Sequence, residues 1–123
     1  MDLVISSADA SFLMIIENKI DSGETREDQV VSYLAWLERQ THWKRPAVKL
    51  IYLTVDGCRA ERADPDKYVC LSYREDIRLW LREVVANIHA VRLSQVVNQY
   101  LEVVDKLSQE AGGWQWRTST KPK

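Results

Sequence analysis

Three consecutive polar residues follow an apolar run near the N-terminus, and their types suit metal-assisted hydrolysis. Glu17, Asn18 and Lys19 come directly after the run from Phe12 to Ile16. In a β-strand, alternation puts Glu17 and Lys19 on one face, roughly 6.6 Å apart, and Asn18 on the other. A carboxylate that holds a divalent cation, beside an ammonium that steadies a water or a phosphate oxygen, would explain polar groups on an otherwise buried face. The simpler alternative is an ion pair between Glu17 and Lys19, which contributes little if exposed.

A second carboxylate, Asp2, is predicted to lie beside this pair. The segments on either side of a small polar stretch, residues 6–11, read as two strands of a β-hairpin. A turn at the centre of this stretch places Asp2 directly opposite Glu17. Two opposed carboxylates repel each other unless a cation lies between them. Asp2, Glu17 and Lys19 would then form a cluster in which a divalent ion activates water and neutralises charge on a phosphate.

The elements that position this cluster are predicted from apolar periodicity and turn residues. After the hairpin we expect a helix from Thr25 to about Gln40, a strand over 48–55, a turn at 63–67, a strand over 68–73, and helices over about 77–88 and 93–107, with the break between them near 89–92. This order predicts an α/β fold with a mixed central β-sheet flanked by α-helices. Residues 1–111 would form the domain and residues 112–123 a polar basic tail.

The apolar stripes of the last two helices have two interpretations. Trp80 and Tyr100 lie on or beside these stripes, and we expect them in the core. The strength of the stripes also makes them candidates for a dimer interface.

The composition is that of an ordinary globular domain, and its net charge conceals a segregation. The 123 residues are 46% hydrophobic and 28% charged, with a net charge of −1. Residues 1–30 hold seven acidic and two basic side chains, whereas residues 39–62 hold six basic and two acidic ones. A cation site beside a phosphate-binding surface would give this pattern, as would two solvated faces.

The chain has no signal-peptide pattern, no apolar run that could span a bilayer and no CxxC pair, so we expect a cytoplasmic protein with reduced thiols.

The residues of the cluster resemble the core motifs of the PD-(D/E)XK nuclease superfamily. The resemblance is carried by Asp2 with the strand after it, by the run Ile16-Glu17-Asn18-Lys19-Ile20-Asp21, and by Gln29-Val30-Val31-Ser32-Tyr33. The last stretch matches the QxxxY motif of exonuclease-like branches. The resemblance covers most of residues 2–107 and implies a restriction-endonuclease-like fold.

The resemblance implies a role for each matching residue. Members of the superfamily use the aspartate and glutamate, here Asp2 and Glu17, as ligands of Mg²⁺ (or Mn²⁺). In many members the backbone carbonyl between the glutamate and the lysine, here that of Asn18, also contacts the metal. Lys19 would orient the nucleophile or stabilise the transition state.

Further residues are expected to line the cleft and hold DNA. Gln29 and Tyr33 stand one helical turn apart, which puts them on one face, and the resemblance places them at the border of the metal site and the DNA. Tyr33 is equally well explained as a core aromatic. The candidate phosphate contacts are basic side chains of the middle segment: Arg39, Lys44, Arg45 and Lys49.

The sequence departs from the family pattern at its beginning. The family core has a helix and a strand before the aspartate, and here only Met1 precedes Asp2. We therefore expect an N-terminally minimal domain, whose missing layer is supplied by a second copy in a homodimer or by another partner chain.

Two classes of function are consistent with these residues. The first hypothesis is a metal-dependent deoxyribonuclease that hydrolyses DNA phosphodiester bonds. The alternative is a catalytically degenerate nuclease-fold module that binds DNA or acts as a structural or oligomerisation subunit.

Overall fold

In the computed structural model, residues 2–20, 27–43 and 48–110 are described. They form the strands β1 (Leu3–Ser6), β2 (Leu13–Lys19), β3 (Val48–Thr54) and β4 (Val69–Ser72), and the helices α1 (Glu27–Arg39), α2 (Arg78–Ala86) and α3 (Val91–Glu110). A short 3₁₀-helix, η1 (Pro65–Lys67), precedes β4, and a π-helical segment, η2 (Tyr73–Ile77), joins β4 to α2.

The four described strands form one mixed sheet in the order β1-β2-β3-β4. β1 and β2 are antiparallel, with Leu3 opposite Ile16, whereas β2, β3 and β4 are mutually parallel. The tight loop between β1 and β2 is closed by a hydrogen bond from the backbone N–H of Ser7 to the carbonyl of Phe12, 3.0 Å long. The predicted hairpin and the predicted mixed sheet are therefore confirmed.

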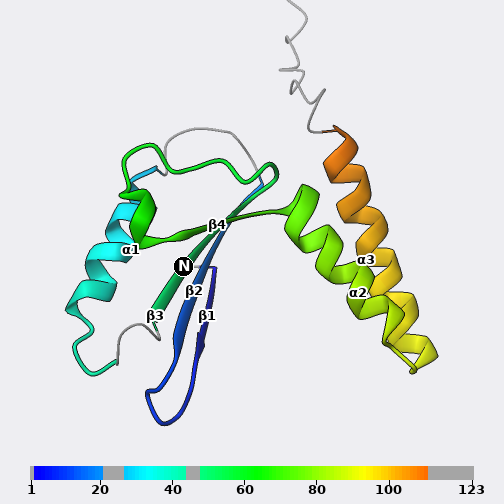
Figure 1. Cartoon of the computed structure of the whole chain (residues 1–123), viewed down its shortest axis with the longest axis horizontal. Helices are drawn as coiled ribbons and strands as arrows, with labels where there is room; N and C mark the ends of the chain where they lie inside the picture. The colour runs from blue at the N-terminus through cyan, green and yellow to red at the C-terminus, as the bar shows by residue number, and fades with distance from the viewer. Residues whose placement is uncertain (1, 21–26, 44–47, 111–123) are drawn as a thin grey trace, which may run out of the picture.

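Helices pack on both sides of this sheet. α1 lies on one side, and η2, α2 and α3 lie on the other (Figure 1). The α1 side of the sheet is sealed by Leu13, Ile15 and Leu50, which pack with Val30 and Leu37 of α1. The opposite core contains Leu53, Tyr73, Leu81 and Val104. These two cores hold β2 and β3 between them, and this fixes which face of β2 each polar side chain occupies.

The predicted element boundaries differ from the structure mainly at turns. The break between the last two helices covers 87–90, about two residues before the predicted 89–92. Tyr73, predicted to end a strand, instead begins η2, because the Ser72 side chain caps that segment by accepting the backbone N–H groups of Glu75 and Asp76. Thr25 and the tail over 112–123 lie outside the described residues.

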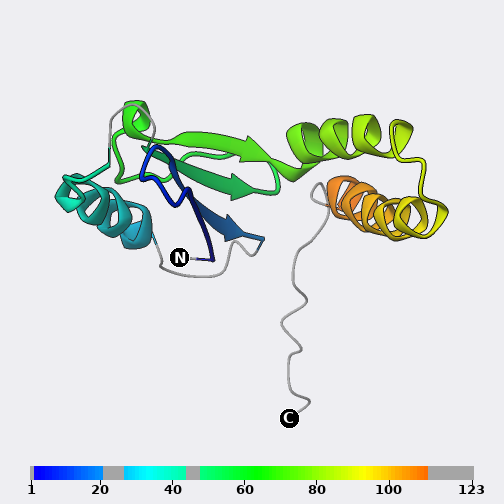
Figure 2. The same cartoon turned by 90° about the horizontal axis from the view of Figure 1, so that it is seen from below.

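The prediction that Trp80 and Tyr100 belong to the core is wrong. Trp80 is 57% exposed and Tyr100 46% exposed. α2 and α3 pack against each other and against η2 through other residues, chiefly Leu81 and Val104. The helical pair extends beyond the edge of the sheet (Figure 2), and no described element covers its outer apolar side chains.

Candidate active site

The parallel strands bring their carboxyl ends to one edge of the sheet, where the predicted cluster lies. Glu17 of β2 is level with Tyr52 of β3, and Lys19 is level with Thr54. α1 lies to one side of the sheet (Figure 1). In open α/β sheets, ligands bind outside the carboxyl ends of the strands. The fold therefore presents the carboxyl end of β2 at a position suited to a site.

Asp2 reaches this edge through the hairpin. The register that sets Leu3 opposite Ile16 places Asp2 opposite Glu17 one residue further. A carboxylate oxygen of Asp2, Oδ2, accepts the backbone N–H of Asn18 at 2.7 Å. The contact brings Asp2 to the residue between Glu17 and Lys19, as the hairpin prediction required, and a short bond to a charged acceptor is among the stronger kinds.

Glu17 is a buried carboxylate. Its residue is only 7% exposed and lies on the α1 side of the sheet after Leu13 and Ile15. Burial, and then neighbouring groups that include Glu17, raise the pKa of Tyr52 to about 12. Taking a carboxylate out of water is costly, and a cation at the same place offsets that cost.

Lys19 and Asn18 separate as alternation predicts. Lys19 lies on the Glu17 side and is half-buried, whereas Asn18 projects to the opposite side. There the side-chain oxygen of Asn18 accepts a hydrogen bond from the Tyr73 hydroxyl at 3.0 Å. Asn18, the residue between Glu17 and Lys19, is thus held at its backbone N–H by Asp2 and at its side chain by Tyr73.

Gln29 and Tyr33 lie one turn apart in the first half of α1, and both are half-buried. Tyr33 packs against the core on the α1 side, in agreement with its interpretation as a core aromatic. Gln29 lies in the first turn of α1. Their predicted contact with DNA stays a prediction.

The donors present fit a hard divalent cation. Asp2 and Glu17 offer carboxylate oxygens, and the family resemblance predicts the carbonyl of Asn18 as a third oxygen ligand. Mg²⁺ prefers oxygen ligands and keeps several waters, so it needs only one or two carboxylates from the protein. Among the described residues no group of three or more His, Cys, Asp or Glu side chains is placed to hold a metal. A site here would therefore rely on backbone and water oxygens as well as on Asp2 and Glu17.

Two of the four candidate phosphate contacts lie in the described part of the chain. Arg39 is exposed in the last turn of α1, at the opposite end of that helix from Gln29. Lys49 is exposed near the start of β3, level with Met14 and three residues before Tyr52. Lys44 and Arg45 lie outside the described residues. The predicted contacts of Arg39 and Lys49 with DNA stay predictions.

Two residues beside the cluster were not identified from the sequence. Strand alternation indicates that Tyr52 faces the core, but only the β2–β3 register shows that it neighbours Glu17. Tyr73 is separated from Asn18 by 55 positions, and no local pattern links the two.

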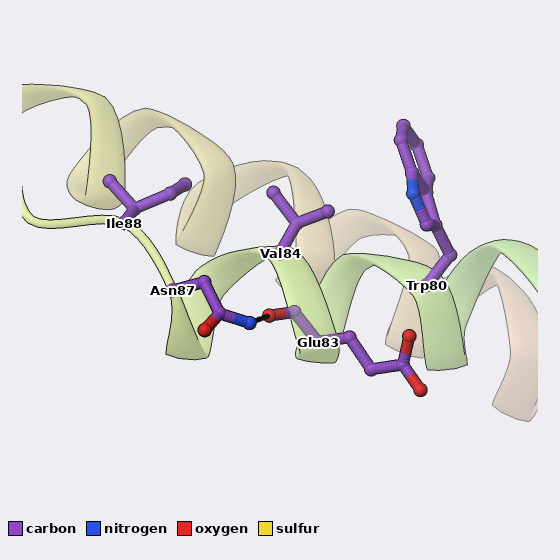
Figure 3. A pocket seen from close by; sticks show the side chains of 5 residues that line it. All are labelled: Trp80, Glu83, Val84, Asn87 and Ile88. Carbon is purple, nitrogen blue, oxygen red and sulfur yellow. Dashed lines mark hydrogen bonds between the residues drawn. The ribbon is translucent and has the colours of Figure 1, made fainter.

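A shallow hollow lies elsewhere, on the outer side of α2. It has a volume of about 410 Å³ and is lined by Trp80, Glu83, Val84, Asn87 and Ile88. Figure 3 shows Trp80 and Val84 projecting from α2, with the side-chain amide of Asn87 donating to the Glu83 carbonyl at 2.8 Å. Glu83 is the only titratable residue of its lining, so this hollow lacks the paired carboxylates of the sheet edge.

A known protein family matches most of this chain. The sequence model of the PD-(D/E)XK nuclease superfamily matches residues 1–102. The chain therefore belongs to this superfamily, and its four-stranded mixed sheet with flanking helices is consistent with a restriction-endonuclease-like fold. Nucleases of this superfamily generally use divalent metals. Neither the curated proteins nor the solved structures include a match to the chain.

None of the described helices combines the length and the apolar character that a membrane crossing requires.

Proposed function

We propose that this protein is a divalent-metal-dependent nuclease that hydrolyses DNA phosphodiester bonds. The observation that carries the proposal is the hydrogen bond of 2.7 Å from the Asn18 N–H to Asp2, because it joins the aspartate to the Glu-x-Lys strand. Membership of the PD-(D/E)XK superfamily supports the same reaction class. Glu17 is buried beside this contact, so a cation held by Asp2 and Glu17 would lie against the protein rather than in open solvent.

The chain's own residues have separate tasks in this reaction. Asp2, Glu17 and the Asn18 carbonyl would hold Mg²⁺ or Mn²⁺. When bound, that ion would lower the pKa of water so that hydroxide, the attacking nucleophile, forms near neutral pH. It would also offset negative charge on the phosphate. Lys19, on the same side of the sheet as Glu17, orients the attacking water or stabilises the charge that develops on the phosphate oxygens.

The direct test is cleavage of single- and double-stranded DNA with Mg²⁺, with Mn²⁺ and with a chelator. We expect cleavage only with the metals, and at least a roughly 100-fold loss in Lys19→Ala, as is usual when one charge-stabilising donor is removed. Lys106→Ala is the matched control, because Lys106 is an exposed lysine on α3. Circular dichroism checks that both variants keep the fold. Equal cleavage by Lys19→Ala and Lys106→Ala, or no cleavage by the wild type with either metal, would contradict the proposal.

A second function, self-association, is favoured by the outer side of α3. Its apolar side chains are spaced alternately three and four residues apart, which is the repeat by which helices pack in coiled coils. These residues are between 46% and 62% exposed: Leu93, Val96, Tyr100 and Val103. We propose that this stripe packs against the same stripe of a second copy, since one such stripe is complementary to itself across a two-fold axis.

Sedimentation equilibrium tests the self-association proposal. We expect a concentration-dependent dimer that Val96→Glu shifts to monomer. Gln95→Glu adds the same charge at the neighbouring exposed position and should leave the dimer intact. A monomer at every concentration, or equal dimerisation by both variants, would exclude this interface. A dimer that shows no metal-dependent cleavage would support the structural role over the enzymatic one.

A further inference from the structure

The strand residue between Glu17 and Lys19 is held from the side of the sheet opposite to these two residues. The side chain of Asn18 leaves β2 toward α2 and α3, and its Oδ1 accepts the Tyr73 hydroxyl at 3.0 Å. The backbone N–H of the same asparagine donates to Asp2 at 2.7 Å. A continuous chain of hydrogen bonds therefore runs from Tyr73 through Asn18 to Asp2.

Tyr73 is itself rigidly placed. It is 6% exposed and packs with Leu53, Leu81 and Val104. It begins η2, a segment whose first turn is anchored because Asp76 accepts both the N–H and the hydroxyl of the preceding serine, at 2.7 and 3.1 Å. A side chain fixed by this packing can hold its hydrogen-bond partner in one orientation.

The hydrogen-bond geometry makes the Tyr73 hydroxyl the donor. An amide oxygen can only accept, so the hydroxyl donates to Asn18 Oδ1 at 3.0 Å. The structural explanation, that Tyr73 only fills the core, accounts for its ring but not for the direction of its hydroxyl.

We propose that Tyr73 is a positioning residue of the metal site, acting through Asn18 to hold the Asp2 carboxylate and the Asn18 backbone carbonyl where one cation can meet both. The inference rests on the proposed metal-dependent function. Tyr73 contacts neither metal nor substrate in this arrangement. Groups that orient metal ligands in this way typically account for a 10- to 100-fold difference in metal affinity.

The variant that tests this role is Tyr73→Phe, which keeps the ring and removes the hydroxyl. Its matched control is Tyr68→Phe, because Tyr68 is 7% exposed and its hydroxyl also makes buried hydrogen bonds, to the backbone of Ala60. Both variants lose one buried hydroxyl, and only the first loses the link to Asn18. A merely structural role would affect the two variants alike.

Mn²⁺ binding is measured by electron paramagnetic resonance of the free ion, without DNA. We expect roughly tenfold weaker binding or more in Tyr73→Phe and wild-type affinity in Tyr68→Phe. In an Asn18→Ala background, Tyr73→Phe should cause no further loss, because the residue acts through that side chain. Equal affinity in wild type and Tyr73→Phe, or full additivity with Asn18→Ala, would overturn the inference.

Amide hydrogen exchange at Asn18 in the metal-free protein gives a second readout. Loss of the Tyr73 hydroxyl should accelerate exchange of the Asn18 N–H, because the bond to Asp2 is held less firmly. The inference would be overturned, even if metal binding fell, by an exchange rate in Tyr73→Phe equal to that in Tyr68→Phe.

Mn²⁺ binding by the wild type distinguishes failure of the inference from failure of the proposed function. If the wild type binds no Mn²⁺, both the proposed function and the role of Tyr73 are refuted. If the wild type and Tyr73→Phe bind Mn²⁺ with equal affinity, only the role of Tyr73 is refuted.

Discussion

Asp2 and Asn18 are joined across the hairpin by a hydrogen bond of 2.7 Å from the backbone N–H to the carboxylate. The bond links the residue before β1 to the residue that separates Glu17 from Lys19. It therefore ties the position of the exposed Asp2 to the strand that carries the rest of the candidate site.

Substitution of Asp2 should separate its structural role from its role as a metal ligand. Asp2→Ala removes the acceptor and should lower the free energy of unfolding by about 1 kcal/mol, the usual net contribution of one hydrogen bond. Asp2→Asn keeps an acceptor oxygen and should lower the free energy of unfolding by less than Asp2→Ala does. Both variants should nevertheless lose Mn²⁺ binding. Urea unfolding and Mn²⁺ titration measure the two effects. Retention of full metal affinity by Asp2→Asn would show that Asp2 is no ligand.

Glu17→Gln should abolish the stabilisation of the protein by metal. A ligand that binds only the folded state at 100 times its dissociation constant adds about 2.7 kcal/mol of stability, which is roughly a 10 °C rise in Tm for a domain of this size. We expect Mn²⁺ to raise the Tm of the wild type by roughly 10 °C and to leave the Tm of Glu17→Gln unchanged. Thermal unfolding with and without Mn²⁺ is the measurement, and Glu75→Gln, at an exposed glutamate in η2, is the control. A similar rise in wild type and Glu17→Gln would place the cation elsewhere.

Gly57 should resist substitution because of its backbone conformation and its contact with β4. Its φ is +79°, and an added Cβ would lie 3.2 Å from the Cβ of Ser72. Gly57→Ala should lower the free energy of unfolding by about 1–2 kcal/mol, the cost of left-handed backbone for a residue with a Cβ. Gly57→Asn sets the same Cβ against Ser72 but tolerates this φ better, so it should be less destabilising. Chemical denaturation measures both, and equal losses would assign the whole effect to the Ser72 contact.

The turn residue Asp9 should make stability depend on pH in the acidic range. Hydrogen bonds, chiefly from the Ser11 side chain and then from Ser7, lower the pKa of Asp9 from 3.8 to about 2. Ser11 donates to this carboxylate through its hydroxyl at 2.7 Å and its backbone N–H at 3.1 Å. Because the folded-state pKa lies below the unfolded one, the stabilisation is present above about pH 4 and is lost as the pH falls toward 2. The Tm difference between wild type and Asp9→Asn should shrink over this range, and a constant difference from pH 5 to pH 2 would refute the assignment.

Local sequence patterns determined the candidate site to a large extent. The small polar turn sets the hairpin register, and the period of two in a strand places Glu17 and Lys19 on one side and Asn18 on the other. These inferences succeeded because they depend on neighbours within a few residues along the chain. The order of elements likewise predicted the mixed sheet.

Only the tertiary structure decided which distant residues meet. Tyr73 reaches Asn18 because it packs with Leu53 on the side of the sheet to which the Asn18 side chain projects. An apolar stripe cannot reveal such a contact across 55 positions. The exposure of Trp80 has a similar origin, since periodicity identifies the apolar stripe of a helix but not whether another element covers it. The position of Lys49, level with Met14 rather than with Glu17, was also beyond sequence, because segregation of charge along a chain does not specify its arrangement in space.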